Sequence, residues 1–386
     1  MTRGSTGPLP GAPEPWAASE MPPFRSRPPY LMTEMIAAEP ALAQRLIGRL
    51  GGQASVDALA TAIREAAAKH RPIVVTGCGT SEHAAIAVAE LLSEALATDP
   101  GRDVRAMPAL DVARRPLASG VLVGVSHEGG TTVTNAALEA TRQAGGSTAL
   151  ITVGSGSPGA ALADLLVTTE EQDQSWCHTV GYLSPIVAGV VVASRVAGSR
   201  LDAAAIHALL DVAHDPRAAA DLAAGLDGVD RLLVAGAGPD RAAARELALK
   251  VAEGAHLPAE AIDLETVLHG TLAAATRWTG MVVIATDPGD GALSGDRLRR
   301  VLEAARTLGM PAAGLVAEPI AAALEAGLTP GGRIVLPQTG RVRGAAAQLL
   351  APVIPLQLVA ERLARARHVD PDTLGREDEA QAAAHA

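Results

Sequence analysis

Residues 73–92 read IVVTGCGTSEHAAIAVAELL, and residues 232–255 read LLVAGAGPDRAAARELALKVAEGA. Each stretch places a short aliphatic run before a Gly-x-Gly turn and an Ala- and Leu-rich run, which is the pattern of a strand, a tight turn and a helix. Gly77 and Gly236 lie 159 residues apart, and the next apolar run repeats at the same offset, as VLVGVS at 121–126 and GMVVIA at 280–285. The chain therefore carries two copies of one strand-turn-helix plan.

Further apolar runs follow in both halves, TALITV and LLVTT in the first and AAGLVA and RIVLPQ in the second. Strands that alternate with helices predict parallel sheets covered by helices on both faces. We expect an α/β fold of two tandem subdomains, each a mainly parallel five-stranded sheet flanked by helices. The expected boundaries are a flexible Pro-rich arm at 1–28, a first subdomain with an N-terminal helix at 29–200, a second subdomain at 201–365 and a C-terminal tail at 366–386.

Composition excludes several classes of function. Apolar residues make up 48% of the 386 residues, so a large core is expected, while the net charge of −10 without a basic run argues against nucleic acid and anionic membranes. The two cysteines, Cys78 and Cys177, suit a reducing cytoplasm and cannot build a disulfide framework. With no signal peptide and no apolar stretch of spanning length recognised, we expect a cytoplasmic globular protein.

Two hydroxyl-rich loops follow the first and second strands of the first half, CGTS at 78–81 and SHEGGT at 126–131. In open parallel sheets ligands bind beyond the carboxyl ends of the strands, where these loops should lie. The corresponding loops of the second half, GAGPD and ATDPGDG, carry fewer hydroxyls. The first turn lacks the third glycine of a dinucleotide fingerprint, and no Gly-Lys-Ser/Thr follows it, so neither cofactor site nor P-loop is expected. Tight strand-to-helix connections are the plainer interpretation of each turn alone.

The motifs CGTSEHA, VSHEGGTTVTNAAL and ALKVAEGAHLPAEAIDLETVLHG together resemble the sugar isomerase (SIS) family over roughly residues 30 to 376. The resemblance is greatest to the isomerase part of glucosamine-6-phosphate synthase and to fructosamine deglycases. It implies two tandem SIS-type subdomains, no cofactor, no metal, and a homodimer whose active sites are shared between subunits. It also implies a set of sugar-binding residues: Cys78, Gly79, Thr80, Ser81, Ser126, Gly129 and Thr131.

This sequence departs from the family pattern at His127 and Glu128, which stand where the family has a glutamine and a second serine. A carboxylate in a phosphate cradle would repel the ligand by about 4 kcal/mol at 4 Å and an effective dielectric near 20. Alternatively, Glu128 turns outward or caps the following helix through Thr131 and Thr132. The sequence leaves both interpretations open, and with them the question of whether the substrate is phosphorylated.

Lys250 and Glu253 lie three residues apart on one helix face, and His269 follows sixteen residues after Glu253. The plainer interpretation is a solvated salt-bridge ladder. The resemblance implies instead that Glu253 moves the proton between C1 and C2 of an open-chain sugar, that Lys250 lines the site, and that His269 opens the ring. A carboxylate suits this chemistry because one base must take and return the same proton.

Two further segments bear on the site. The stretch DQSWCHTVGYLSP at 173–185 supplies Trp176 and His178 as candidate sugar contacts, although an ordinary helix start with a core Trp fits equally. Arg376 stands where the synthase has a lysine that forms an imine with the sugar; arginine cannot do so, which argues against amide-nitrogen transfer. A metal site built from His127, Glu128, His178 and His269 has no ligand-type spacing to support it.

These observations predict an enzyme without a glutaminase domain, because residue 2 is Thr and no such domain fits before residue 30. The expected reaction is aldose–ketose isomerisation, or deglycation or deamination of an amino sugar or fructosamine. The alternatives are an isomerase-derived enzyme for a non-phosphorylated metabolite and a non-catalytic sugar-binding regulator. The sequence does not name the substrate.

Overall fold

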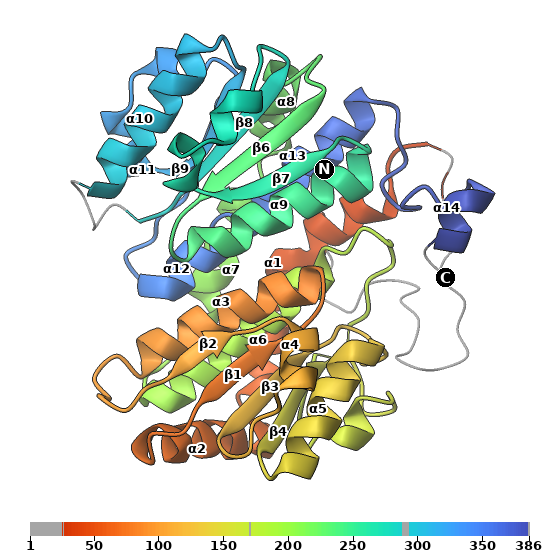
Figure 1. Cartoon of the computed structure of the whole chain (residues 1–386), viewed down its shortest axis with the longest axis vertical. Coiled ribbons are helices and arrows are strands. Elements are labelled where there is room, and N and C mark those ends of the chain that lie inside the picture. Colours follow the sequence, from red (N-terminus) through yellow and green to blue (C-terminus); the bar gives the residue numbers. More distant parts are fainter. Residues whose placement is uncertain (1–24, 26, 170, 288–292, 385–386) are drawn as a thin grey trace.

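The computed structural model describes residue 25 and residues 27–169, 171–287 and 293–384, so the aromatic residues Trp16 and Phe24 of the expected arm lie outside the described residues. Two five-stranded parallel sheets lie at opposite ends of the long axis in Figure 1, with helices between and outside them. The predicted fold class, two α/β units each with a five-stranded sheet, is confirmed.

The first sheet has the order β2-β1-β3-β4-β5. Its strands and helices, in chain order, are α1 (Leu31–Leu50), α2 (Ala54–Ala68), β1 (Ile73–Thr76), α3 (Thr80–Ala95), β2 (Val104–Ala106), α4 (Ala109–Arg114), β3 (Val121–Val125), α5 (Thr132–Ala144), β4 (Ser147–Thr152), β5 (Leu165–Thr168) and α6 (Val180–Ala197).

The second sheet, in the order β7-β6-β8-β9-β10, has the same topology as the first. Its elements are α7 (Ala203–Ala213), α8 (Pro216–Gly225), β6 (Arg231–Gly236), α9 (Asp240–Ala255), β7 (Ala259–Asp263), β8 (Thr279–Ala285), α10 (Leu293–Thr307), β9 (Ala312–Ala317), α11 (Glu318–Ala323), β10 (Arg333–Leu336), α12 (Gly344–Leu350), α13 (Val353–Ala366) and α14 (Glu379–Ala384). The strands not singled out in the sequence, β2 and β7, are edge strands. Both mix polar with apolar residues, so neither shows a continuous apolar run.

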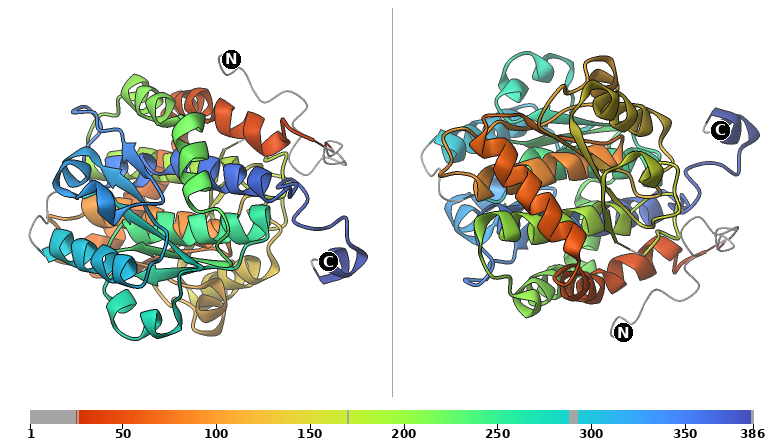
Figure 2. Two further views of the ribbon diagram at one scale, coloured as in Figure 1. Left: turned by 90° about the horizontal axis from the view of Figure 1, so that it is seen from above. Right: turned by 90° about the horizontal axis from the view of Figure 1, so that it is seen from below.

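One continuous core joins the two halves. The inner faces of both sheets pack against a shared layer in which α3 contacts α6 and α9, and α13 contacts α9. Smaller apolar clusters fill the outer faces, one with Val301 and Leu302 of α10 and one with Leu138 of α5. Figure 2 views the molecule from above and below and shows the C-terminal helix α14 standing apart from the body. The shared layer brings residues of the two halves together at the carboxyl edge of the first sheet.

The expectation of no apolar stretch of spanning length is wrong for two segments. Val180–Ala197 and Gly344–Ala366 are long and apolar enough by length and composition alone, with mean hydropathies of 1.6 and 1.3. However, 89% and 78% of these windows are buried inside the fold, because α6 and α13 belong to the central layer and face protein on most sides. A core helix covered all round carries no polar face to distinguish it from a spanning helix.

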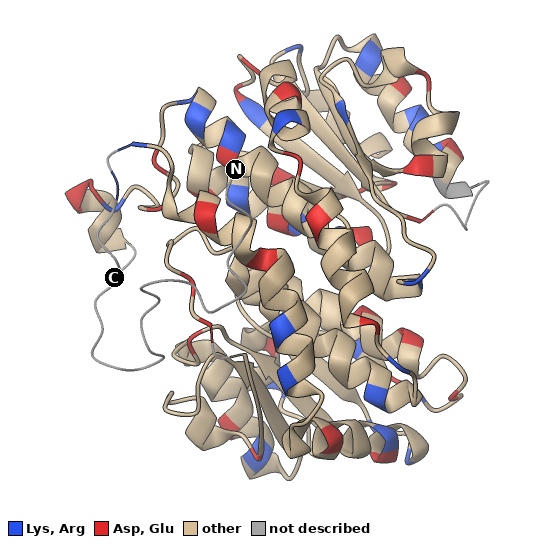
Figure 3. Ribbon diagram, turned by 180° about the vertical axis from the view of Figure 1, so that it is seen from behind, with Lys and Arg blue, Asp and Glu red and all other residues tan. Residues whose placement is uncertain are grey.

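Basic and acidic residues are interspersed along the described helices, as the blue and red ribbon segments of Figure 3 show. On α10, Arg299 pairs with Asp296 and Glu303 at 2.6 and 2.7 Å. Such exposed pairs contribute little to stability, and the charges that bear on the site are the buried ones described next.

Candidate active site

The turn between β1 and α3 is shaped by two glycines. A Cβ at Gly77 would lie 2.5 Å from the carbonyl oxygen of Ser81, and Gly79 has a φ of +57°, a backbone region that favours glycine. This tight path starts α3 directly at Thr80, so the hydroxyls of Thr80 and Ser81 lie at the carboxyl edge of the sheet.

The loop after β3 lies beside this turn, because β1 and β3 are neighbours in the sheet. Cys78 Sγ lies 3.6 Å from Thr134 Oγ1 of α5, and within the loop Ser126 Oγ donates to Thr131 Oγ1 at 3.3 Å. Gly129 has a φ of +69°. The sheet order reverses direction between β1 and β3, which makes this edge the topological switch point where ligands bind in open α/β sheets.

Glu128 is half-buried and accepts a hydrogen bond from Gln172 Nε2 at 3.0 Å. Its neighbour His127 is buried, and its Nε2 accepts the N–H of Asp173 at 2.9 Å. Burial lowers the pKa of His127 to about 4, so the ring is neutral near pH 7. The loop is therefore anchored from both residues to the segment 172–173 that precedes α6.

Asp173 organises the start of α6. Its carboxylate accepts the N–H groups of Thr179 and Gly181, at 3.1 and 2.5 Å, and so caps this helix. Burial raises the pKa of Asp173 to about 7, although these N–H donors and the charge of Lys250 favour the carboxylate. The ring centroid of His178 lies 5.1 Å from that of His127, and burial lowers the pKa of His178 well below its usual range.

The helix α9 brings a charged cluster from the second half to this edge. Lys250 is fully buried, and its Nζ lies 2.5 Å from Glu253 Oε2 and 3.7 Å from Glu246 Oε1. Burial lowers the pKa of Lys250, but the adjacent carboxylates, Glu253 foremost, outweigh burial and raise it. The solvated-ladder interpretation does not describe this helix face, since Lys250 and Glu246 have no exposed side-chain surface.

Contacts to Glu246 join the two halves. Thr80 Oγ1 donates to Glu246 Oε1 at 3.2 Å, and His83 Nδ1 lies 2.7 Å from Glu246 Oε2. The first turn of α3 and the Lys250 cluster of α9 thus touch through a fully buried carboxylate. A ligand on the Thr80 turn would lie within reach of the Lys250–Glu253 pair.

Comparison with known proteins agrees with this architecture, although no family model matches the sequence. The chain is 30% identical over 370 residues to a glutamine–fructose-6-phosphate aminotransferase (isomerizing) of Symbiobacterium thermophilum. That alignment covers 89% of this chain and 57% of the enzyme, so the chain spans little more than half of its relative's length.

Two solved structures share the arrangement. The C-terminal domain of glucosamine-fructose-6-phosphate aminotransferase from Francisella tularensis superposes with a TM-score of 0.76 and 18% identity, over 89% of this chain and 98% of that one. Tagatose-6-phosphate ketose/aldose isomerase from Escherichia coli superposes with a TM-score of 0.70 and 18% identity, over 92% and 98% of the two chains. The chain has the tandem SIS fold. The resemblance to the SIS family is confirmed.

The C-terminal segment packs against the start of α1 and against the segment that precedes α6. Asp372 accepts the N–H groups of Leu31 and Met32 at 2.7 and 2.9 Å and so caps α1. The guanidinium of Arg376 stacks over the half-buried Trp176 ring at 3.7 Å, and within the described part of the chain Arg376 Nε has no hydrogen-bond partner. A pocket of about 770 Å³ lies between the tail and the end of α9, lined by Glu253, His256 and Gly375 among others.

His269 lies on the surface, outside the pocket that Glu253 lines. Its side chain is 68% exposed, and its Nε2 lies 2.9 Å from Glu265 Oε1 on the loop after β7. It does not line the pocket beside Glu253. Within the described residues of one chain, Thr80 of the first hydroxyl-rich loop is joined through Glu246 to the Lys250–Glu253 pair. The pocket beside Glu253 is lined by neither hydroxyl-rich loop, and His269 is exposed on the surface.

Two polar residues of this edge were not singled out in the sequence: His83 and Asp173. The position of His83 one turn into α3 is a signal that could have found it. No local pattern identifies Asp173, because its partners become helix donors only when the fold forms. Within the described ranges, no group of three His, Cys, Asp or Glu residues could hold a metal ion.

Proposed function

We propose that this chain is an SIS-type enzyme that moves a proton between C1 and C2 of an open-chain sugar or amino-sugar derivative. The observation that carries the proposal is the ion pair between the fully buried Lys250 and the half-buried Glu253, 2.5 Å apart, which is joined through Glu246 to the Thr80 turn. An exposed ion pair is commonplace, whereas a fully buried lysine must be matched by carboxylates and is costly to retain without a role. The relatives named above are themselves isomerases or aminotransferases of sugar phosphates by name.

In this mechanism the Glu253 carboxylate takes the proton from the carbon next to the carbonyl, and an enediolate forms. The proton of the neighbouring hydroxyl moves to the former carbonyl oxygen, and the Glu253 carboxyl returns its proton to the former carbonyl carbon, so that aldose and ketose interconvert with no net loss or gain. The Lys250 ammonium donates a hydrogen bond to Glu253 Oε2 and so orients the base. For a fructosamine the same shift converts the ketoamine into an imine, which water hydrolyses to an aldose and an amine.

The loops 78–81 and 126–131 would hold the far end of the sugar. Thr131 and Thr132 are exposed at the start of α5, where free N–H groups suit an anion, but the Glu128 carboxylate lies in the same loop. We therefore infer a ligand that is neutral or cationic at this end, a free hydroxyl or an amine. Arg376 cannot form an imine, so amide-nitrogen transfer is not proposed.

We further propose a homodimer in which His269 reaches the partner's site, because its exposure in one chain fits a contribution across an interface. Mixing inactive Glu253→Gln and His269→Ala proteins should regenerate activity, since a mixed dimer contains one site free of both changes. If subunits exchange and no activity returns, the site is built within one chain.

The reaction itself is tested by proton NMR in D₂O with a panel of aldoses, ketoses, amino sugars and fructosamines, each with and without phosphate. Isomerase chemistry incorporates solvent deuterium at C1 or C2 of the true substrate, and Glu253→Gln should prevent it. Ligands that bind but exchange no carbon-bound hydrogen would show a sugar-binding regulator instead.

A further inference from the structure

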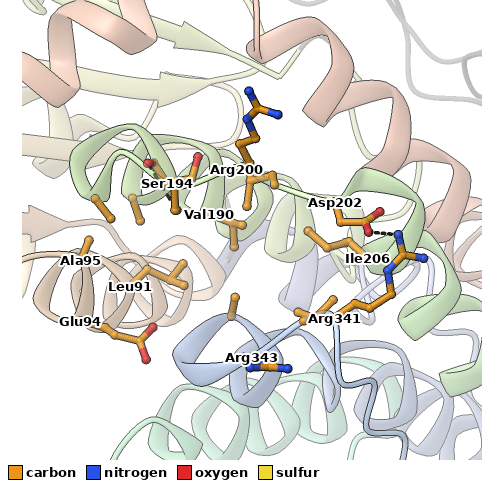
Figure 4. Close-up of a pocket in the computed structure, with 16 residues that line it drawn as sticks. Leu91, Glu94, Ala95, Val190, Ser194, Arg200, Asp202, Ile206, Arg341 and Arg343 are labelled. Carbon is orange, nitrogen blue, oxygen red and sulfur yellow. Dashed lines mark hydrogen bonds and ion pairs between the residues drawn. The ribbon is translucent and has the colours of Figure 1, made fainter.

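A second pocket lies away from the proposed sugar site, between α3, α6, the segment before α7 and the segment before α12. It has a volume of about 320 Å³ and is shown in Figure 4. Leu91 of α3, Val190 of α6 and Ile206 of α7 provide an apolar wall, while Arg200, Arg341 and Arg343 stand at its edges. An apolar cavity with a few polar groups at its rim is the usual form of a small-molecule site.

The internal repeat relates this pocket to the sugar site. The offset of 159 residues that pairs Gly77 with Gly236 also pairs Leu91 with Lys250 and Glu94 with Glu253. Val342 and Arg343 line in addition an adjoining pocket of about 420 Å³ beyond the ends of β9 and β10, at Ala317 and Leu336. The pocket thus combines the end of α3 with loops of the second half, just as the sugar site combines the end of α9 with loops of the first.

The counterpart cannot perform the same chemistry. Leu91 replaces the lysine, and the Glu94 carboxylate already accepts the N–H of Ala345 at 3.1 and 3.0 Å. Asp202 is also occupied, because it caps α7 through the N–H of Ala205 at 3.0 Å and pairs with Arg341. Both carboxylates of the pocket are therefore bonded within the protein.

Arg343 is the cationic group left for a ligand. Its Nε donates to the carbonyl oxygen of Gly340 at 2.6 Å, which holds the side chain in place, and its terminal NH₂ groups form no ion pair within the described residues. Arg200 adds a second positive charge at the rim, although its guanidinium points away from Arg343 in Figure 4. With three arginines and two bonded carboxylates, the pocket has an excess of positive charge around an apolar wall.

We propose that this pocket binds a small organic anion, a phosphate or carboxylate carried on an apolar body, and that its occupancy is transmitted to the sugar loops. The anionic group pairs with Arg343, and the body packs against Leu91, Val190 and Ile206. Transmission follows from two shared helices, since α3 runs from Thr80 at the sugar site to Glu94 at the pocket, and α6 runs from the Asp173 cap to Ala197 at the pocket. A ligand that shifts one end of a packed helix moves the other.

Isothermal titration of the full chain with phenyl phosphate, benzoate and inorganic phosphate tests the binding and separates the two anion chemistries. Arg343→Gln should weaken the organic anion that binds by about tenfold, the factor that corresponds to about 1.4 kcal/mol for a charge-assisted hydrogen bond. Ala197→Trp, at the exposed end of α6, should fill the pocket and abolish binding, whereas Arg300→Gln, an exposed arginine of the outer helix α10 that does not line the pocket, should have no effect. Binding of neither organic anion at millimolar concentration, or binding that both pocket variants leave unchanged, overturns the proposal.

Transmission has a readout independent of any sugar. The chain has two cysteines, of which Cys177 is fully buried and Cys78 is half-buried in the first sugar loop, so a thiol reagent reports on Cys78. Saturation with the binding anion should change the modification rate of Cys78 at least about twofold in wild type and not in Arg343→Gln. An anion that binds through Arg343 and leaves the Cys78 rate unchanged overturns the coupling.

Discussion

The turns that follow β1 and β6 have nearly the same backbone conformation, but their side chains make different contacts. Gly79 and Gly238 have φ values of +57° and +54°, and a Cβ at Gly77 or Gly236 would lie 2.5 or 2.8 Å from the carbonyl oxygen four residues later. That residue is Ser81 in the first half and Asp240 in the second. The duplicated turn therefore differs chiefly in the side chain that it presents at the carboxyl edge.

Asp240 occupies hydrogen-bond donors of the second half that a ligand would otherwise bind. Its buried carboxylate accepts the hydroxyl and the N–H of Thr286, at 2.5 and 3.1 Å, and these are donors of the loop after β8. In the first half, no hydrogen bond among the described residues joins Ser81 to the equivalent loop, 126–131. The comparison teaches that one acidic side chain can satisfy internally the donors that a binding site would offer.

The largest expected difference between the two halves is the activity that depends on Glu253. Glu253→Gln keeps the shape of the side chain and removes the base, so turnover should fall by about 10²–10⁴-fold while the fold is retained. The measurement is the rate of the reaction found in the D₂O panel. Glu260→Gln, an exposed glutamate on β7, is the matched control and should match wild type. Near-normal turnover in Glu253→Gln would remove the base from the mechanism.

Replacing Ser81 by aspartate, the residue of the second half, should weaken ligand binding at the first-half site. Ser81→Asp places a carboxylate where Asp240 stands and should bind the donors of the 126–131 loop, so ligand affinity should fall by about 10²-fold. Titration calorimetry with the established ligand measures the change, and Ser81→Asn separates charge from size. Unchanged affinity in Ser81→Asp would show that the two turns are not equivalent.

Glu128 is expected to determine whether the first-half site prefers a phosphorylated or a non-phosphorylated sugar. Glu128→Ser removes a negative charge beside the free N–H groups of α5, so preference for a phosphorylated over a non-phosphorylated form of one sugar should rise by about tenfold. Glu128→Gln retains an oxygen for the bond from Gln172 and shows whether charge alone is responsible. A wild type that already prefers the phosphorylated sugar would contradict the inferred neutral or cationic ligand end.

The smallest expected effect concerns stability. Burial raises the pKa of Asp240 to about 7, above its unfolded value of 3.8, so the folded state binds the proton more tightly. The stability that the proton contributes is complete below about pH 4 and is lost as pH rises to about 7, by about 2 kcal/mol once relaxation of the buried charge is allowed for. Denaturant unfolding from pH 4 to 8 should show a shallower decline in Asp240→Asn. Asp173 titrates in the same range, so the informative quantity is the difference between variant and wild type. Parallel curves would place the Asp240 pKa near its ordinary value.

Much of the fold was accessible from local patterns. The helix expected at the start of the first subdomain is α1 (Leu31–Leu50), and the apolar runs that begin at Ile73 and lie at 121–126 and 148–153 overlap β1, β3 and β4. The strands β2 and β7 escaped because they mix polar with apolar residues, whereas the edge strands β5 and β10 carry apolar runs. The buried helix α6 was not recognised as long and apolar enough to span a membrane, although its composition alone would allow that.

The sequence by itself determined the duplicated plan, since glycines and apolar runs recur at one offset and each element follows from short-range chemistry. It also placed Lys250 and Glu253 on one helix face. Only the tertiary structure decided that Thr80 and His83 meet Glu246 across more than 160 residues of chain, that Asp173 caps α6, and that Asp240 closes the second site. Those contacts depend on how the sheets pack through a shared helical layer, and packing between distant segments leaves no periodic signal in either segment.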